Sequence, residues 1–154
     1  MILSSREAIM TALVNLLAGV FFQGSVNGRT TWTGVYRRLK LWNDVAKADR
    51  PVLFVTQHGD TTGYSSASLP AKVTMDVDLF VYIDSSDPNA IPATSLNIIL
   101  EAVEAAIAPQ PGPGGMQTLG GLVQHVRREG KAVMDPGDID GDGLLLIPLK
   151  IFTL

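Results

Sequence analysis

The chain has 154 residues, of which 46% are hydrophobic and 18% charged, and it contains no cysteine. Its length is enough to bury one core, and its composition is that of a globular chain. A formal charge of −3 argues against a general phosphate-binding surface. The lack of cysteine excludes disulfides, thiolate metal sites and cysteine nucleophiles. We therefore expect one soluble domain over residues 1–154.

The first predicted element is a helix that begins near Ser4. Ser4 and Glu7 have the spacing of a capping box, in which each side chain hydrogen-bonds the other's backbone amide. Gly19 favours a helix end at that position. The apolar residues recur at helical spacing on one face, which indicates a core helix and not a signal peptide: Ile9, Leu13, Leu16, Leu17 and Val20.

Three strands are expected in the next part of the chain, after a polar segment at 21–33 that contains the turn signal Asn27-Gly28. Residues 35–42 alternate between apolar and polar side chains, as in a strand with one wet face. Residues 52–55 are short and apolar enough for a buried strand. The polar segment 58–69 is predicted as a long loop, and residues 73–83 alternate most clearly of all.

A second helix is predicted from about Thr94, and the proline- and glycine-rich segment 109–115 ends it. Its buried stripe comprises Leu96, Ile99, Leu100, Val103 and Ile107, with Glu101 and Glu104 on the wet side. Residues 122–134 and 144–154 are further strand candidates, joined by an acidic turn at 135–143. Because several strands follow one another directly, we expect an α+β fold: a largely antiparallel mixed sheet with two helices packed on one face.

The sharpest chemical motif lies in the acidic turn. Asp138, Asp140, Asp142 and Gly143 match the first half of an EF-hand calcium loop. The match then fails, because Leu149 occupies the position of the bidentate glutamate and the flanks read as strands. Aspartate and glycine are also what a tight turn between strands demands. We therefore interpret these residues as a turn and expect no bound metal.

No catalytic constellation emerges from the remaining polar residues. His58, Asp60 and a serine at 65, 66 or 68 would crowd one loop, with no rigid element to hold a triad. His125 is expected on a strand surface, and Asp76 and Asp78 are expected as sheet-surface carboxylates without a cleft. The glycines at 112–115 lie between prolines and lack the strand–loop–helix context of a phosphate site. We expect no enzyme activity and no cofactor.

Taken in blocks, the chain resembles the tail terminator proteins of long-tailed bacteriophages. The blocks are residues 37–45, 51–59, 76–82, 87–92 leading into the second helix, and 117–123, and the acidic turn and closing strand complete the pattern. They are framework segments, so they are specific only in combination. The segments 22–33 and 58–70 depart from the pattern, and either partner specificity or neutral drift would account for that.

The resemblance implies a structural virion protein at the head-proximal end of the tail, present in the host cytoplasm during assembly. It implies a six-membered ring that caps the tail tube, stops its elongation and joins it to the head connector. Its partners would be copies of itself, the tube protein and the connector or neck protein, with no membrane. DNA would pass through the ring without specific binding.

Residues at an interface are expected within two polar segments, 21–33 and 58–69. Both have few apolar groups to pin them, so we expect them to be mobile in the free subunit and ordered in the assembly. Phe21, Phe22, Trp32 and Tyr64 are the candidate anchors for a neighbour.

Three other functions stay open at this stage. A head-completion or neck protein would be a similar small ring subunit of the head–tail interface. A calcium- or small-ligand-binding module would use the turn at 138–142, and a hydrolase would use the loop around His58.

Overall fold

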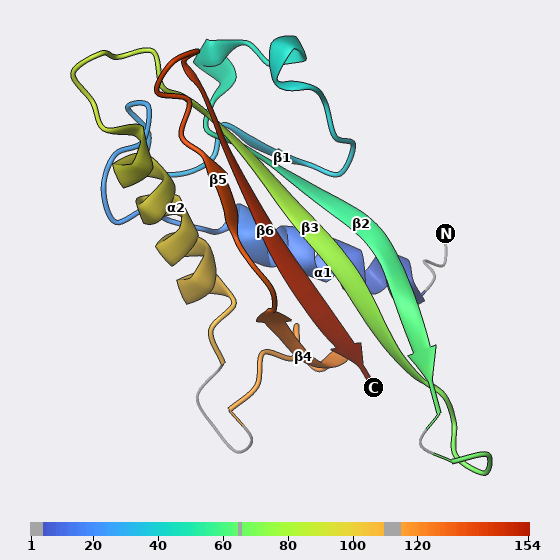
Figure 1. Ribbon diagram of the computed structural model, residues 1–154. Coiled ribbons are helices and arrows are strands. Elements are labelled where there is room, and N and C mark those ends of the chain that lie inside the picture. The colour runs from blue at the N-terminus through green and yellow to red at the C-terminus, as the bar shows by residue number, and fades with distance from the viewer. Residues whose placement is uncertain (1–4, 65, 110–114) are drawn as a thin grey trace.

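The structure is a computed structural model that describes residues 5–64, 66–109 and 115–154. Within these ranges the elements are α1 (Ser5–Ala18), β1 (Gly34–Tyr36), the short 3-10 helices η1 (Trp42–Asp44) and η2 (Lys47–Asp49), β2 (Val52–Gly63), β3 (Lys72–Asp84), α2 (Pro92–Ala106), β4 (Val123–Arg128), β5 (Val133–Asp135) and β6 (Asp142–Thr153). Long strands cross the whole molecule, and both helices lie on one side of them (Figure 1). Ser4 of the predicted capping box and the glycines at 112–114 lie outside the described residues.

The sheet has the order β1-β2-β3-β6-β4, and β5 also pairs with β6. Among the described residues, the short β1–β2 pair is parallel and the other strand pairs are antiparallel. The predicted α+β class and largely antiparallel mixed sheet are therefore confirmed. No helix of the described ranges is long and apolar enough to cross a membrane.

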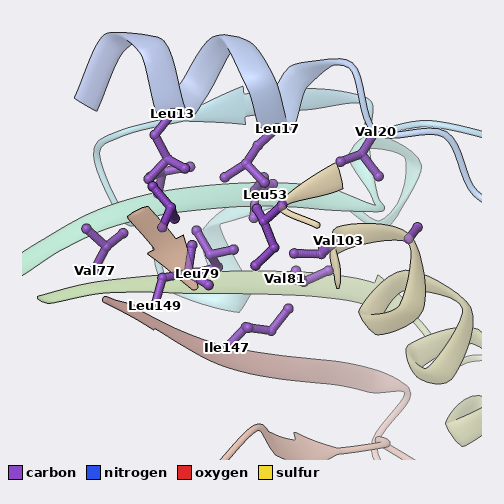
Figure 2. Packing of buried hydrophobic residues seen from close by; sticks show 14 of the residues in the cluster. Leu13, Leu17, Val20, Leu53, Val77, Leu79, Val81, Val103, Ile147 and Leu149 are labelled. Carbon is purple, nitrogen blue, oxygen red and sulfur yellow. The ribbon is translucent and has the colours of Figure 1, made fainter. Parts of the chain in front are cut away.

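The main core lies between the sheet and the two helices. In β3, alternate residues from Met75 to Ile83 are buried there, because successive side chains of a strand point to opposite faces. Figure 2 shows Leu13 and Leu17 of α1 on the side of the sheet where Leu79 lies. The predicted stripe of α2 is buried except for Leu100, which is only partly buried. This burial supplies the main driving force for folding, at roughly 25 cal/mol per Å² of apolar surface.

Two predicted boundaries in the first half of the sheet are wrong. The strand expected at 35–42 ends at Tyr36, and the chain then leaves the sheet. There Arg37 donates a hydrogen bond to Glu7 of α1 at 2.6 Å. Conversely, β2 runs on to Gly63, so half of the loop expected at 58–69 is strand. Its threonines suit a strand, and the backbone of β3 pairs with them up to Lys72.

The strand predicted at 122–134 is divided into β4 and β5. Both pair with β6, where Pro148 lies between the two pairings. Proline has no N–H to donate to a ladder, which accounts for the break at this point.

The segment 21–33 is packed against the core, contrary to the expectation that few apolar groups pin it. Asn27 and Gly28 adopt φ values of 51° and 75°, as the predicted tight turn requires. Phe22, Val26 and Trp32 are buried. The Trp32 ring packs edge-on against Phe22, and its Nε1 donates to the Leu17 carbonyl at 2.9 Å.

Candidate functional site

After β1 the chain crosses the face of the sheet opposite the helices, and we call residues 37–50 the strap. Val45 of the strap packs on a second, smaller cluster formed by Val52, Phe54 and Tyr82. The Tyr82 hydroxyl donates to the Lys40 carbonyl at 2.5 Å. Few apolar residues hold the strap, so polar contacts must contribute much of its attachment.

Arg50 makes four of those polar contacts. Its side chain is only 2% exposed. One terminal nitrogen donates to the carbonyls of Trp42 and Val45, at 2.7 and 3.1 Å. The other donates to the Ile83 carbonyl at 3.2 Å and to the Asp142 carboxylate at 2.7 Å. One guanidinium therefore ties the strap to β3 and β6, which makes it a structural clamp.

The clamp explains the acidic turn. Asp142 is the partner of Arg50, and Asp140 accepts a hydrogen bond from the Asp142 backbone amide at 2.9 Å. Gly141 adopts φ 83° and donates to the Gly137 carbonyl. The described residues contain no group of three or more histidine or acidic side chains that could hold a metal ion. Asp140 and Asp142 thus have roles in a turn, and Asp138 lines the groove described next.

Exposed apolar side chains collect at the end of the sheet where the strap lies, and we call this surface the strap end. It comprises Leu41, Trp42, Ile91 and Ile139, of which Ile91 is 71% exposed and Ile139 fully exposed. A groove of about 550 Å³ lies between residues 85–92 and 138–141. Asp140 lines both this groove and a smaller cavity beside Trp42, so the two lie next to each other. In Figure 1 these segments meet at the top of the molecule.

Charge interactions stiffen the strap end. Lys47 of the strap donates to the Ser86 hydroxyl at 2.5 Å and lies 3.7 Å from Asp84. Burial raises the pKa of the Asp84 carboxyl, but hydrogen bonds from Ser86 and the charges of Lys47 and Arg50 outweigh it and lower this pKa overall. Burial raises the pKa of Tyr82, against the opposing effect of Arg50. Asp84 therefore stays ionised, and Tyr82 stays protonated as a donor.

The four candidate interface aromatics divide into two groups. Phe21 and Tyr64 are 61% and 70% exposed and are accessible to a partner. Phe22 and Trp32 are buried in the core, which corrects the expectation that all four face a neighbour. Their rings pack inside the subunit, because this small core has few other aromatic side chains to fill it.

The polar residues considered for catalysis are dispersed over the sheet. His58 is exposed and its Nδ1 lies 3.4 Å from Asp78, while Asp60 accepts a hydrogen bond from Arg6. Asp76 pairs with Lys150 at 2.7 Å. His125 accepts a hydrogen bond from the Gln117 amide through its Nδ1. Each group has a partner other than the one that a triad or acid pair would require.

Arg50 is the main residue that sequence reasoning missed. No sequence motif identifies an arginine whose partners are two carbonyls of its own strap, the Ile83 carbonyl and the Asp142 carboxylate. The available signal is its position two residues before the buried run Val52–Val55, where a long cationic side chain must find buried partners or leave the core.

Neither the models of known protein families nor the curated proteins include a match to this chain.

Proposed function

We propose that the chain is a bacteriophage tail terminator, a structural subunit whose ring closes the tail tube and joins it to the head. The support is the resemblance described above, together with the placement of its segments. Residues 37–45, 87–92 and the acidic turn are far apart in sequence, yet all three contribute to the strap end. This convergence of the family-like segments on one exposed apolar surface is the observation that carries the proposal.

An exposed apolar surface of this kind marks a site of protein association. Arg50 and Lys47 fix the strap end before any partner binds, which reduces the ordering cost of docking. The far end of β2 and β3 presents a different surface, with Tyr64 and Leu69 exposed. A ring of such subunits would offer unlike faces to the tube and to the head, as a terminator requires.

Removal of the gene from the phage tests the proposal directly. A tube of identical stacked rings presents the same addition surface after every layer, so its geometry alone supplies no stop. Without a terminator, we expect tubes that overrun their length together with filled heads that lack tails. Purified protein added to the knockout extract should restore infectious particles. Tails of normal length joined to heads would rule the role out, and complete tails that fail only to join would indicate a neck protein.

A pair of surface variants tests the strap end within that assay. Ile139→Asp changes a fully exposed side chain in the groove, and Leu122→Asp changes an exposed leucine outside it. Both variants should fold, because neither residue belongs to the core. We expect Ile139→Asp to lose most of the restoring activity and Leu122→Asp to keep it. Full restoration by Ile139→Asp would show that the strap end is not a docking surface.

A further inference from the structure

The sheet has two open margins on opposite sides. β1 covers β2 only at Val52–Phe54, and the rest of β2 pairs with β3 alone in the described chain. On the other side, β5 pairs with β6 alone among the residues that the structure places. The stretch of β4 from Val123 to Val126 is not open, because the Val123 and Val126 amides donate to the carbonyls of Thr118 and Gln117 at 3.2 and 2.9 Å. The open stretches are thus residues 59–63, beyond a bulge in β2, and residues 131–135, of which Val133–Asp135 are strand within the subunit.

Neither open stretch contains a proline, and the stretch in β2 also lacks lysine. Unpaired backbone N–H and C=O groups on a sheet edge are a template for another strand, and proteins commonly block them with proline or lysine. Residues 59–63 contain neither, and Val133 is an exposed β-branched residue in β5. Asp60, the charged residue within 59–63, is paired with Arg6 of α1, whereas the second stretch begins with Lys131 and ends with Asp135.

We infer that copies of this chain join head to tail through these margins, with residues 59–63 of one copy antiparallel to residues 131–135 of the next. This rests on the proposed ring. Within the subunit, β2–β3, β3–β6 and β6–β5 are all antiparallel, so β2 and β5 run in opposite directions. A neighbour that keeps its helices on the same side therefore presents β2 antiparallel to β5. Neighbouring strands then stay antiparallel across the contact between the two copies.

When the two stretches are aligned centre to centre, the side chains that face each other are also compatible. Thr61 lies opposite Val133, a favourable pair of β-branched residues. The charged residues Lys131 and Asp135 lie opposite the glycines at 63 and 59, which leave room for them. Thr61 and Val133 both lie on the sheet face away from the helices. Thr61 pairs with Thr74 of β3. Val133 pairs with Leu146 of β6, which in turn pairs with Phe80 of β3.

This arrangement shifts neighbouring copies along the strands. Thr61 is level with Thr74 of β3 and Val133 with Phe80, six residues further along. At about 3.3 Å per residue the shift is about 20 Å. Strands that close into a ring require such a stagger, since an unshifted sheet cannot tilt to meet itself. The inferred contact therefore favours closure.

Cysteine crosslinking tests the contact, because the chain has no cysteine of its own. Opposite residues on antiparallel strands have Cα atoms about 4.5–5.5 Å apart, within disulfide reach. We expect Thr61→Cys with Val133→Cys to give a ladder of covalent oligomers beyond the dimer on oxidation. The matched pair Thr62→Cys with Val133→Cys, whose side chains point to opposite faces, should give none.

Each remaining outcome overturns the inference. Covalent dimers from Thr61→Cys alone would indicate a two-fold pairing of β2 with itself. Absence of the ladder both in the purified protein and in particles complemented with the double variant would exclude the contact. Native mass and negative-stain images of the same samples report the ring independently. A ring without the ladder refutes this contact alone, whereas failure of complementation by the wild-type protein refutes the proposed function.

Discussion

Arg50→Met removes the clamp while keeping most of the side-chain volume. It leaves the carbonyls of Trp42, Val45 and Ile83 and the Asp142 carboxylate without their donor. Breaking a buried ion pair by removing one partner costs about 3–5 kcal/mol, and each buried group left unpaired costs about 1–3 kcal/mol. Water can reach Asp142, whose side chain is 25% exposed, so we expect the lower part of that sum. The free energy of unfolding should fall by about 3–5 kcal/mol, a large share of a typical domain's stability.

Urea denaturation followed by tryptophan fluorescence measures this loss, since Trp42 lies in the strap and Trp32 in the core. The control is Arg37→Met, which removes a partly exposed ion pair with Glu7 and should cost less than about 1 kcal/mol. We also expect Trp42 to become more accessible to a fluorescence quencher in Arg50→Met. Equal destabilisation by the two variants would refute the role of Arg50 as the clamp.

Three further predictions concern the core, the pH response and the turn. Leu13→Ala should cost roughly 2–5 kcal/mol in chemical denaturation, because Leu13 is fully buried, whereas Glu104→Ala on the wet face of α2 should cost under about 1 kcal/mol. A reversed order would contradict the assigned helix faces. Because the pKa of Asp84 is lowered by folding, its contribution to stability is present above about pH 4 and is lost as pH falls through the folded pKa. Between pH 5 and pH 3 the wild type should therefore lose more stability than Asp84→Asn, and equal losses would contradict this. The acidic turn should bind no calcium at micromolar concentrations, and calorimetric binding abolished by Asp140→Ala would disprove that.

Those elements whose signal is local were predictable from the sequence. The two helices and β3 were predictable from the spacing of their apolar residues. When one face is buried, every second residue of a strand is apolar, and every third or fourth residue of a helix is apolar. The turns at Asn27-Gly28 and at 138–142 follow from residues that tolerate a positive φ. The largely antiparallel arrangement follows from strands that succeed one another without helices between them.

The candidate site was predictable only in part. The acidic turn was recognised as a turn, but nothing in it indicates that Asp142 is the partner of Arg50. The polar composition of their segments predicted that all four interface aromatics are exposed. In the structure only Phe21 and Tyr64 of these four are exposed. A polar segment can still be pinned by a few buried rings, and composition averages over them.

Only the tertiary structure decided where strands end and which surfaces stay open. Residues 35–42 alternate like a strand, but the chain leaves the sheet after Tyr36, because Arg37 turns toward Glu7 and Arg50 holds the strap across the opposite face. Residues 58–63 read as a loop but are strand, because β3 offers them a ladder of backbone partners. In both cases the deciding energy comes from groups far away in sequence. Local patterns report burial and turn geometry, whereas backbone pairing and a buried charge are satisfied only once distant segments meet.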